Sequence, residues 1–181
     1  MPPPKQRFEN LADAAEPPHS LFRVEVTNET DAAIDSARVA AAVQVALAEA
    51  GCTEATVSVA IVDDPTIHRL NRQFLEHDYP TDVLSFVLEE PPQLEGEIIA
   101  SIDTACREAA QVGWAAEDEL LLYAVHGALH LAGYLDKEPA DVAAMRTAER
   151  AVLERLDVKL APNDARWLTP QQALSAAEDR R

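Results

Sequence analysis

The chain has 181 residues, a length typical of one domain with some additional tail. Apolar residues make up 48% of it, close to the globular average, so a wholly disordered chain is excluded. The chain carries 15 basic and 32 acidic residues, a formal net charge of −17. This charge disfavours purely electrostatic binding of nucleic acid, which needs clustered Lys and Arg, but it still allows a small basic site.

Neither a membrane span nor a secretory signal is visible. Purely apolar runs, such as 60–62 and 120–125, are far shorter than the roughly 20 residues that a spanning helix needs. The first residues after Met1 are three prolines and charged side chains, without the apolar region of a signal peptide. We expect a cytoplasmic protein with no membrane partner. Cys52 and Cys106 lack the spacing of a disulfide or zinc-ribbon framework, so we expect two free thiols.

The chain divides into a central domain and two tails. Residues 1–20 are rich in Pro, Ala and charge and have no periodicity, which predicts a flexible N-terminal tail. Residues 21–157 carry all the periodic segments and form the predicted domain. Residues 158–181 are expected to be a weakly ordered C-terminal tail.

Apolar periodicity predicts the elements in chain order. Asp35 or Ser36 is expected to cap the first helix, and Pro65 suits the first turn of the second. Residues 78–81 (Asp-Tyr-Pro-Thr) end that second helix. The expected elements are a strand at 21–30, a helix to residue 50, a strand at 55–62, a helix from 65, strands at 82–88 and 97–102, a helix from 103 or 104 to 111, and helices at about 116–132 and 139–156.

This order of strands and helices indicates the fold class. Mixed strands and helices followed by a block of helices are typical of one α+β domain. We therefore expect a single domain in which a mixed four-stranded sheet packs with about five helices. A metal site is expected on the central helix, for the following reason.

Two histidines and an aspartate suggest that metal site. His126 and His130 lie four positions apart within a helix-favouring segment, so both imidazoles lie on one face of the helix. Gly133 can adopt a positive φ and end the helix, which lets the chain turn back and bring Asp136 to the same ion. Two histidines and one carboxylate leave a fourth zinc position open, as in catalytic sites.

The residue directly after His126 argues against the mechanism of a zinc peptidase. Zinc peptidases of the H-E-x-x-H type carry a glutamate as general base directly after the first histidine, and this chain has Gly127 there. A histidine pair at this spacing, taken by itself, often lies on the surface or in the core without binding a metal. We expect one Zn²⁺ per chain, although iron, nickel or manganese would also suit this ligand set.

Three motifs together are similar to the YbeY family of bacterial rRNA maturation factors. The segment His126–Tyr134 resembles the family's metal signature, whose third histidine is replaced here by Asp136. Residues 70–72 with 78–86 resemble its helix, loop and strand, and residues 96–101 resemble the strand that follows. The motifs span about residues 55–150 in the family's order.

The resemblance implies a function and a ligand set. It implies a single-strand-specific, metal-dependent endoribonuclease that acts on the 3′ end of small-subunit rRNA and in ribosome quality control. Its partners would be ribosomal RNA and the small ribosomal subunit, with no DNA. His126 and His130 would be zinc ligands, with Asp136 as the third. An aspartate is an accepted zinc ligand, but Leu135 replaces a family aspartate that could orient a ligand histidine.

The loop after the second helix departs from the family pattern. The place of a family arginine that serves RNA binding or catalysis falls on Leu75. Arg72 or His77 would have to take its role, so we predict catalytic roles for His126, His77 and Arg72. Arg72 and Thr81 are the predicted substrate-binding residues, although Thr81 could equally satisfy backbone groups of a turn. His77, Tyr134 or a water could donate the proton to the leaving group.

Two other functions remain open at this point. One is a zinc hydrolase acting on peptides or other substrates. The other is a non-catalytic, ribosome-associated factor with a structural zinc, which the net charge and the missing arginine favour. In the last helix, basic and acidic residues alternate at helical spacing, which predicts a solvated, ion-paired face; these residues are Arg146, Glu149, Arg150, Glu154 and Arg155.

Overall fold

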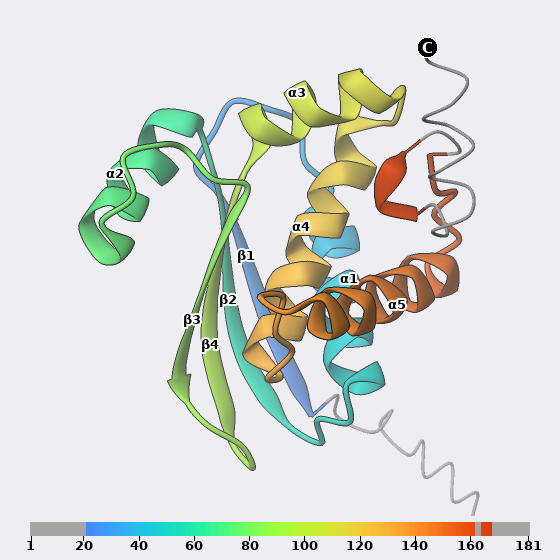
Figure 1. Cartoon of the computed structure of the whole chain (residues 1–181). Coiled ribbons are helices and arrows are strands. Elements are labelled where there is room, and N and C mark those ends of the chain that lie inside the picture. Colours follow the sequence, from blue (N-terminus) through green and yellow to red (C-terminus); the bar gives the residue numbers. More distant parts are fainter. Residues whose placement is uncertain (1–20, 162–163, 168–181) are drawn as a thin grey trace, which may run out of the picture.

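A computed structural model describes residues 21–161 and 164–167 of the chain. These residues form an α+β domain of four strands, five α-helices and one short 3₁₀ helix (Figure 1). This confirms the predicted fold class. The elements are β1 (Phe22–Asn28), α1 (Ser36–Glu49), β2 (Ala55–Val62), α2 (Asp64–Leu75), β3 (Val83–Glu89), β4 (Leu94–Ser101), α3 (Ile102–Val112), α4 (Ala116–Leu131), α5 (Pro139–Arg155) and η1 (Ala165–Trp167).

The four strands form one mixed sheet in the order β1-β2-β4-β3. β1, β2 and β4 pair in parallel, and β3 pairs antiparallel with β4. β3 is therefore an edge strand, and the loop that leads into it from α2 lies at one end of the sheet (Figure 1).

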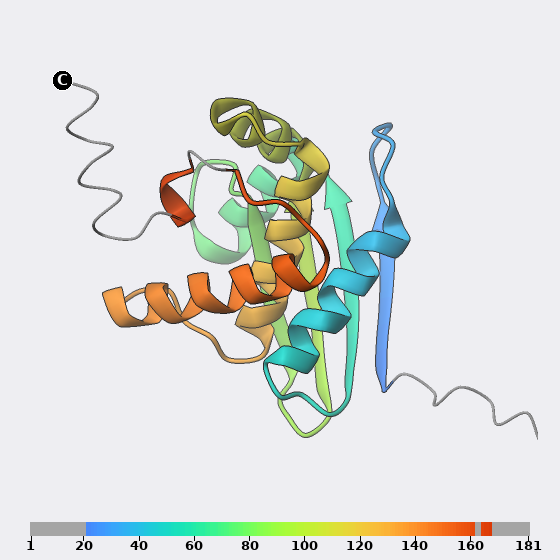
Figure 2. The same cartoon turned by 90° about the vertical axis from the view of Figure 1, so that its right-hand side faces the viewer.

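The two faces of the sheet are covered differently. Helices α1, α4 and α5 lie on one face (Figures 1 and 2), and their apolar side chains form the main core with the inward residues of β1, β2 and β4. Helix α2 packs on the other face through a smaller cluster around Ile67, Val62 and Leu84. Helix α4 is buried along almost its whole length, so it is the central helix that the sequence predicted.

Short polar residues fix where the first three α-helices begin. Asp35 accepts a hydrogen bond from the Arg38 backbone N–H and caps α1, as predicted. Asp63 does the same for α2 by accepting from the Thr66 N–H, and Ser101 caps α3 by accepting from the Thr104 N–H. Because the serine cap lies in the preceding strand, α3 begins at Ile102, one or two residues earlier than predicted.

Strand β4 begins three residues earlier than predicted, at Leu94. Its inward positions include Gly96, which allows α4 to pack closely on the sheet. A Cβ atom at Gly96 would lie 2.8 Å from both terminal methyl groups of Leu131. This close approach holds the C-terminal half of α4, and thus the histidine pair, against the sheet.

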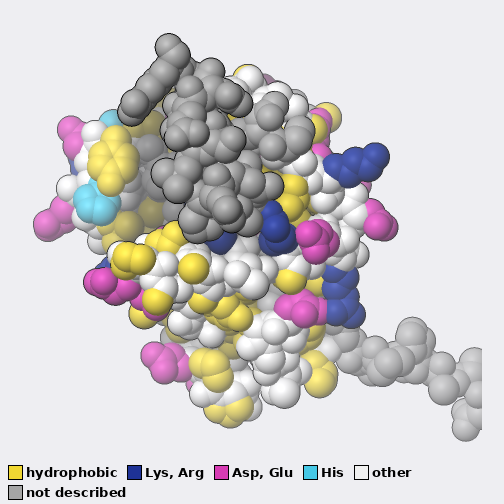
Figure 3. All heavy atoms as spheres, turned by 45° about the vertical axis from the view of Figure 1, so that its right-hand side comes forward, with side chains coloured by type: hydrophobic (Ala, Val, Ile, Leu, Met, Phe, Trp, Pro, Cys, Tyr) yellow, Lys and Arg dark blue, Asp and Glu magenta, His cyan; other side chains and the backbone are white. Residues whose placement is uncertain are grey.

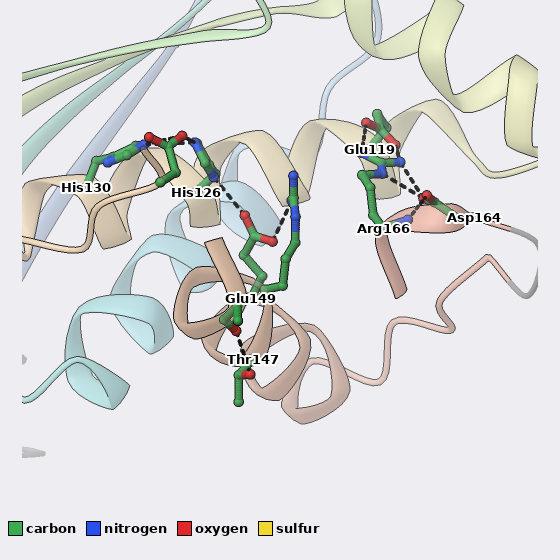
Figure 4. Close-up of polar contacts among 10 residues, drawn as sticks. Glu119, His126, His130, Thr147, Glu149, Asp164 and Arg166 are labelled. Atoms are coloured by element: carbon green, nitrogen blue, oxygen red, sulfur yellow. Dashed lines mark hydrogen bonds and ion pairs between the residues drawn. The ribbon is translucent and has the colours of Figure 1, made fainter. Parts of the chain in front are cut away.

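The described residues of the segment after α5 pack against the domain. Within its described residues, 158–161 and 164–167, four side chains are buried against the domain: Val158, Ala161, Asp164 and Trp167. Arg166 lies between two buried carboxylates, Glu119 and Asp164 (Figure 4). Isolated long-range contacts of this kind have no periodicity, which is why the sequence did not reveal them.

Three further predictions concern the tails, the thiols and the membrane. Residues 1–20 and 168–181 lie outside the described residues. Cys52 and Cys106 are both free, as predicted. Within the part of the chain that the structure describes, no helix is both long and apolar enough to cross a membrane.

Candidate metal centre

The structure brings His126, His130 and Asp136 together. The two histidines lie one turn apart near the end of α4, and their Nε2 atoms are 2.9 Å apart. Helix α4 ends at Leu131, and Gly133 at φ +95° turns the chain back. This turn places Asp136 Oδ2 3.6 Å from His126 Nε2 and 3.4 Å from His130 Nε2.

The other nitrogen of each imidazole ring decides its tautomer. His126 Nδ1 lies 2.7 Å from the Glu149 carboxylate, and His130 Nδ1 lies 2.9 Å from the Tyr134 carbonyl oxygen. Both partners can only accept, so both Nδ1 atoms carry the proton in the neutral rings. The two Nε2 atoms then present lone pairs to each other and to the Asp136 carboxylate. Three lone-pair donors facing one point are satisfied by a cation.

The spacing of these three atoms fits a tetrahedral ion. Bonds of about 2.0–2.1 Å to a tetrahedral zinc place its ligand atoms roughly 3.3 Å apart. The three separations here are 2.9, 3.4 and 3.6 Å. His126 and His130 are partly buried and Asp136 is exposed, so the site is open to solvent on the side of Asp136.

Glu149 is a part of the site that the sequence analysis missed. It reaches from α5 to His126 (Figure 4), and its side chain is fully buried. Arg146 donates to its other oxygen at 2.7 Å. Glu149 is therefore ion-paired, as predicted, but it is buried rather than solvated. The available signal was a helical stripe in which Glu149 shares the spacing of two buried apolar residues, Met145 and Val152.

An open cavity of about 530 Å³ adjoins the three ligands. Thr81 and Ser85 contribute hydroxyl groups to its wall, and Ser85 Oγ is buried without a hydrogen-bond partner among the described residues. The cavity lining comprises Leu75, Thr81, Asp82, Val83, Leu84, Ser85, His126, His130, Tyr134, Leu135, Asp136 and Lys137.

The other predicted site residues are placed as follows. Thr81 lines this cavity, and its hydroxyl donates to Asp82 Oδ1 at 2.8 Å, as in the turn interpretation. Arg72 lies in the last turn of α2, and His77 stacks on Tyr79. Neither Arg72 nor His77 is among the described residues that line the cavity. Their catalytic and substrate-binding roles stay predictions. Leu75, at the place of the family's arginine, does line it.

Gly127 has a packing role that explains why no glutamate stands there. A Cβ atom at this position would lie 2.9 Å from Ile98 Cγ2 and 3.0 Å from Ser85 Oγ. Both distances are shorter than ordinary contacts of a Cβ atom. A larger side chain would push α4 off β4, so a general base of the peptidase type cannot be accommodated without moving the helix.

Comparison with known proteins places the chain in a family. A family model described as "Endoribonuclease YbeY" matches residues 25–157. The chain belongs to the YbeY family. It is 45% identical over 137 residues to "Endoribonuclease YbeY" of Rhodopirellula baltica, covering 74% of this chain and 71% of the relative. It is 37% identical over 133 residues to the protein of the same name from Chlorobaculum parvum, covering 74% and 94%.

A solved structure supports the YbeY fold. The solution structure of TM1509 from Thermotoga maritima matches this chain with a TM-score of 0.52 and 25% sequence identity, and the match covers 78% of this chain and 99% of that one. The resemblance predicted from three short motifs is thus confirmed over the whole domain.

Proposed function

We propose that this protein is a single-strand-specific, metal-dependent endoribonuclease that matures the 3′ end of small-subunit rRNA and takes part in ribosome quality control in the cytoplasm. The proposal includes one Zn²⁺ per chain and the small ribosomal subunit as a partner. It is carried by one observation: three convergent ligand atoms, 2.9–3.6 Å apart, at the wall of an open cavity. Membership of the YbeY family favours RNA cleavage over the two alternatives.

His126, His130 and Asp136 would hold the ion. When bound, such an ion polarises a phosphoryl oxygen and supplies hydroxide near neutral pH. The buried Glu149 carboxylate keeps His126 in the tautomer that presents Nε2, and the Tyr134 carbonyl does the same for His130. Partners of this kind orient the ligands and raise their basicity.

The cavity wall supplies groups for the substrate. The Thr81 hydroxyl lies at this wall, and because its proton is donated to Asp82, its oxygen is suited to accept a hydrogen bond from a ribose hydroxyl. Lys137 brings a positive charge to the same wall. Leu75 and Leu135 are 47% and 57% exposed at the cavity and offer apolar contact to ribose or base. The bases of single-stranded RNA are not paired with a second strand, so base and ribose can both reach these side chains. This supports a single-stranded substrate.

The alternatives are less well supported by the site. Gly127 leaves no room for the base of a zinc peptidase. A purely structural zinc site is normally closed by four protein ligands, whereas three ligands beside an open cavity are typical of catalysis.

The first experiment measures zinc per chain by elemental mass spectrometry. We expect about one ion in the native protein and loss of it in His126→Ala and Asp136→Ala. His68→Ala and Asp78→Ala are matched controls, because these two side chains contact each other and lie outside the cavity lining. Both variants should keep the ion. Absence of bound metal in the native chain would contradict the proposal.

The second experiment tests the reaction. The native protein should cut single-stranded RNA, and His126→Ala should lose cleavage while retaining its helical circular dichroism. Co-sedimentation with the small ribosomal subunit without any cleavage would favour the non-catalytic factor. Cleavage of casein without cleavage of RNA would favour the peptide hydrolase.

A further inference from the structure

A second cleft lies beside the metal cavity. It has a volume of about 380 Å³ and shares Thr81 and Asp82 with the metal cavity as a common wall. Sites of this size are typical of small-molecule groups such as a nucleotide. Its lining within the described residues is Tyr79, Pro80, Thr81, Asp82, Thr104, Arg107, Glu108, Glu119, Tyr123, Arg146 and Arg166.

One wall of this cleft carries an exposed aromatic ring in a fixed position. Tyr79 is 55% exposed, and its ring stacks nearly parallel on His77, with centroids 5.4 Å apart and an angle of 12°. The backbone is held as well, because the buried Asn71 donates from Nδ2 to the Tyr79 carbonyl at 2.8 Å. A ring held in this way is a preformed platform for a nucleobase.

Three arginines contribute to the cleft, but they differ in what they can offer. Arg166 is paired with two buried carboxylates, Glu119 and Asp164, and is a structural group. Arg146 is held by Glu149, the partner of His126. Arg107 is half exposed, and it uses one N–H on each terminal nitrogen for Asp64 and Thr104. Each terminal nitrogen therefore keeps a second N–H for a phosphate oxygen.

Electrostatic attraction alone is weak here. Each arginine of the cleft is paired with a carboxylate, and Lys and Arg on the face shown in Figure 3 lie next to Asp and Glu rather than in a basic patch. Binding of a nucleic-acid strand must then depend on contacts that need little net charge. Stacking of a base on an aromatic ring is such a contact, and it tolerates any sequence.

We propose that this cleft is a second nucleotide subsite, in which the base next to the scissile phosphate stacks on Tyr79 and its own phosphate contacts Arg107. The inference rests on the proposed function, because it assigns single-stranded RNA as the ligand. It adds that Tyr79 and Arg107 determine affinity for the strand, while the metal centre performs the cleavage.

The test is a binding measurement on the full chain, separate from cleavage. A fluorescein-labelled, ten-nucleotide single-stranded RNA is titrated by fluorescence anisotropy in EDTA, which stops metal-dependent cutting. We expect Tyr79→Ala to weaken binding about tenfold and Tyr79→Phe to stay within about twofold of the native chain. Phe74→Ala is the matched control, because Phe74 is also 55% exposed but lies outside the cleft lining; it should have no effect.

Two further readouts identify the contacts. RNA lacking one base at the stacked position should bind the native chain about tenfold more weakly, and this loss should vanish in Tyr79→Ala. Arg107→Gln should reduce the slope of log K against log salt by about 0.7, the value for one phosphate contact on a single strand. Tyr79→Ala should leave that slope unchanged.

The outcomes separate this inference from the proposed function. Binding that is unaffected in Tyr79→Ala, equally reduced in Phe74→Ala, or undetectable in the native chain would overturn the subsite. If the expected binding pattern is found but no RNA is cut after zinc is added, the subsite stands and the nuclease proposal fails. If RNA is cut and Tyr79→Ala binds normally, the nuclease proposal stands and the subsite is wrong.

Discussion

Glu149 on α5 and His126 on α4 are joined by a hydrogen bond of 2.7 Å inside the protein. The carboxylate has no exposed surface. It accepts a hydrogen bond from His126 and is paired with the positive charge of Arg146. This contact ties the position of α5 to the geometry of the metal centre, and it makes α5 part of the site although none of its residues is a ligand.

The first prediction concerns that contact. Glu149→Ala should lower zinc affinity by 10- to 100-fold, the usual effect of removing a group that orients a ligand histidine. It removes the acceptor that fixes the His126 tautomer and leaves Arg146 without its partner. Competition with a chromophoric chelator measures the dissociation constant. Glu154→Ala, at an exposed position of the same helix, should match the native chain; an equal loss there would mean that the helix, rather than the contact, was disturbed.

The second prediction concerns the packing of α4 on the sheet. Gly127→Ala should lower the free energy of unfolding by up to about 2 kcal/mol, because overpacking typically costs about 1–3 kcal/mol and alanine recovers about 1 kcal/mol of helix propensity. The added Cβ would meet Ile98 and Ser85. Urea denaturation measures the loss. Adding Ser85→Ala removes one of the two contacts and should restore part of the stability; a fully additive double variant would argue against a direct clash.

The third prediction concerns the buried network of Arg166. Glu119 has no exposed surface and accepts two hydrogen bonds from Arg166. Arg166→Ala leaves this charge unpaired, which typically destabilises by about 3–5 kcal/mol. Arg155→Ala is the control of the same residue type, because its ion pair with Glu49 is largely exposed and should contribute less than about 1 kcal/mol. Similar midpoints of urea unfolding for the two variants would contradict the prediction.

The fourth prediction concerns pH and Asp64, whose carboxylate joins the start of α2 to α3. Burial alone would raise the pKa of Asp64, but hydrogen bonds from Ser101, Thr104 and Arg107 outweigh it and lower the pKa below its usual value. A lowered pKa in the folded state adds stability above the unfolded pKa of about 3.9. This contribution is lost as the pH falls through the folded value.

Asp64→Asn isolates this contribution. The native chain should be more stable than the variant at pH 6. The difference should shrink progressively below about pH 4, because Asp64 of the unfolded chain takes up a proton there, whereas Asp64 of the folded chain does so only at lower pH. Urea unfolding curves from pH 6 to pH 3 give the two free energies. A difference that is independent of pH would mean that the hydrogen-bond geometry, and not the charge of Asp64, sets its effect.

Much of this protein follows from its sequence because the deciding signals are local. Periodicity placed the four strands and five helices, and Asp35 marked the start of α1. The spacing of His126 and His130 on one helix, followed by Gly133 and Asp136, was enough to predict the three residues that converge. The fold class and the YbeY family were both predicted correctly.

The tertiary structure decided what depends on contacts between distant segments. Glu149 resembles any charged residue of an alternating helix until α5 crosses α4 and buries it beside His126. Arg166 lies in a segment without periodicity, and only its pairing with Glu119, 47 positions away, shows that it belongs to the domain. Tyr79 and Arg107 meet at one cleft because α3 and the loop after α2 lie at the same end of the sheet. Burial and charge pairing across such distances have no local period, so they are determined by the packing of the whole chain.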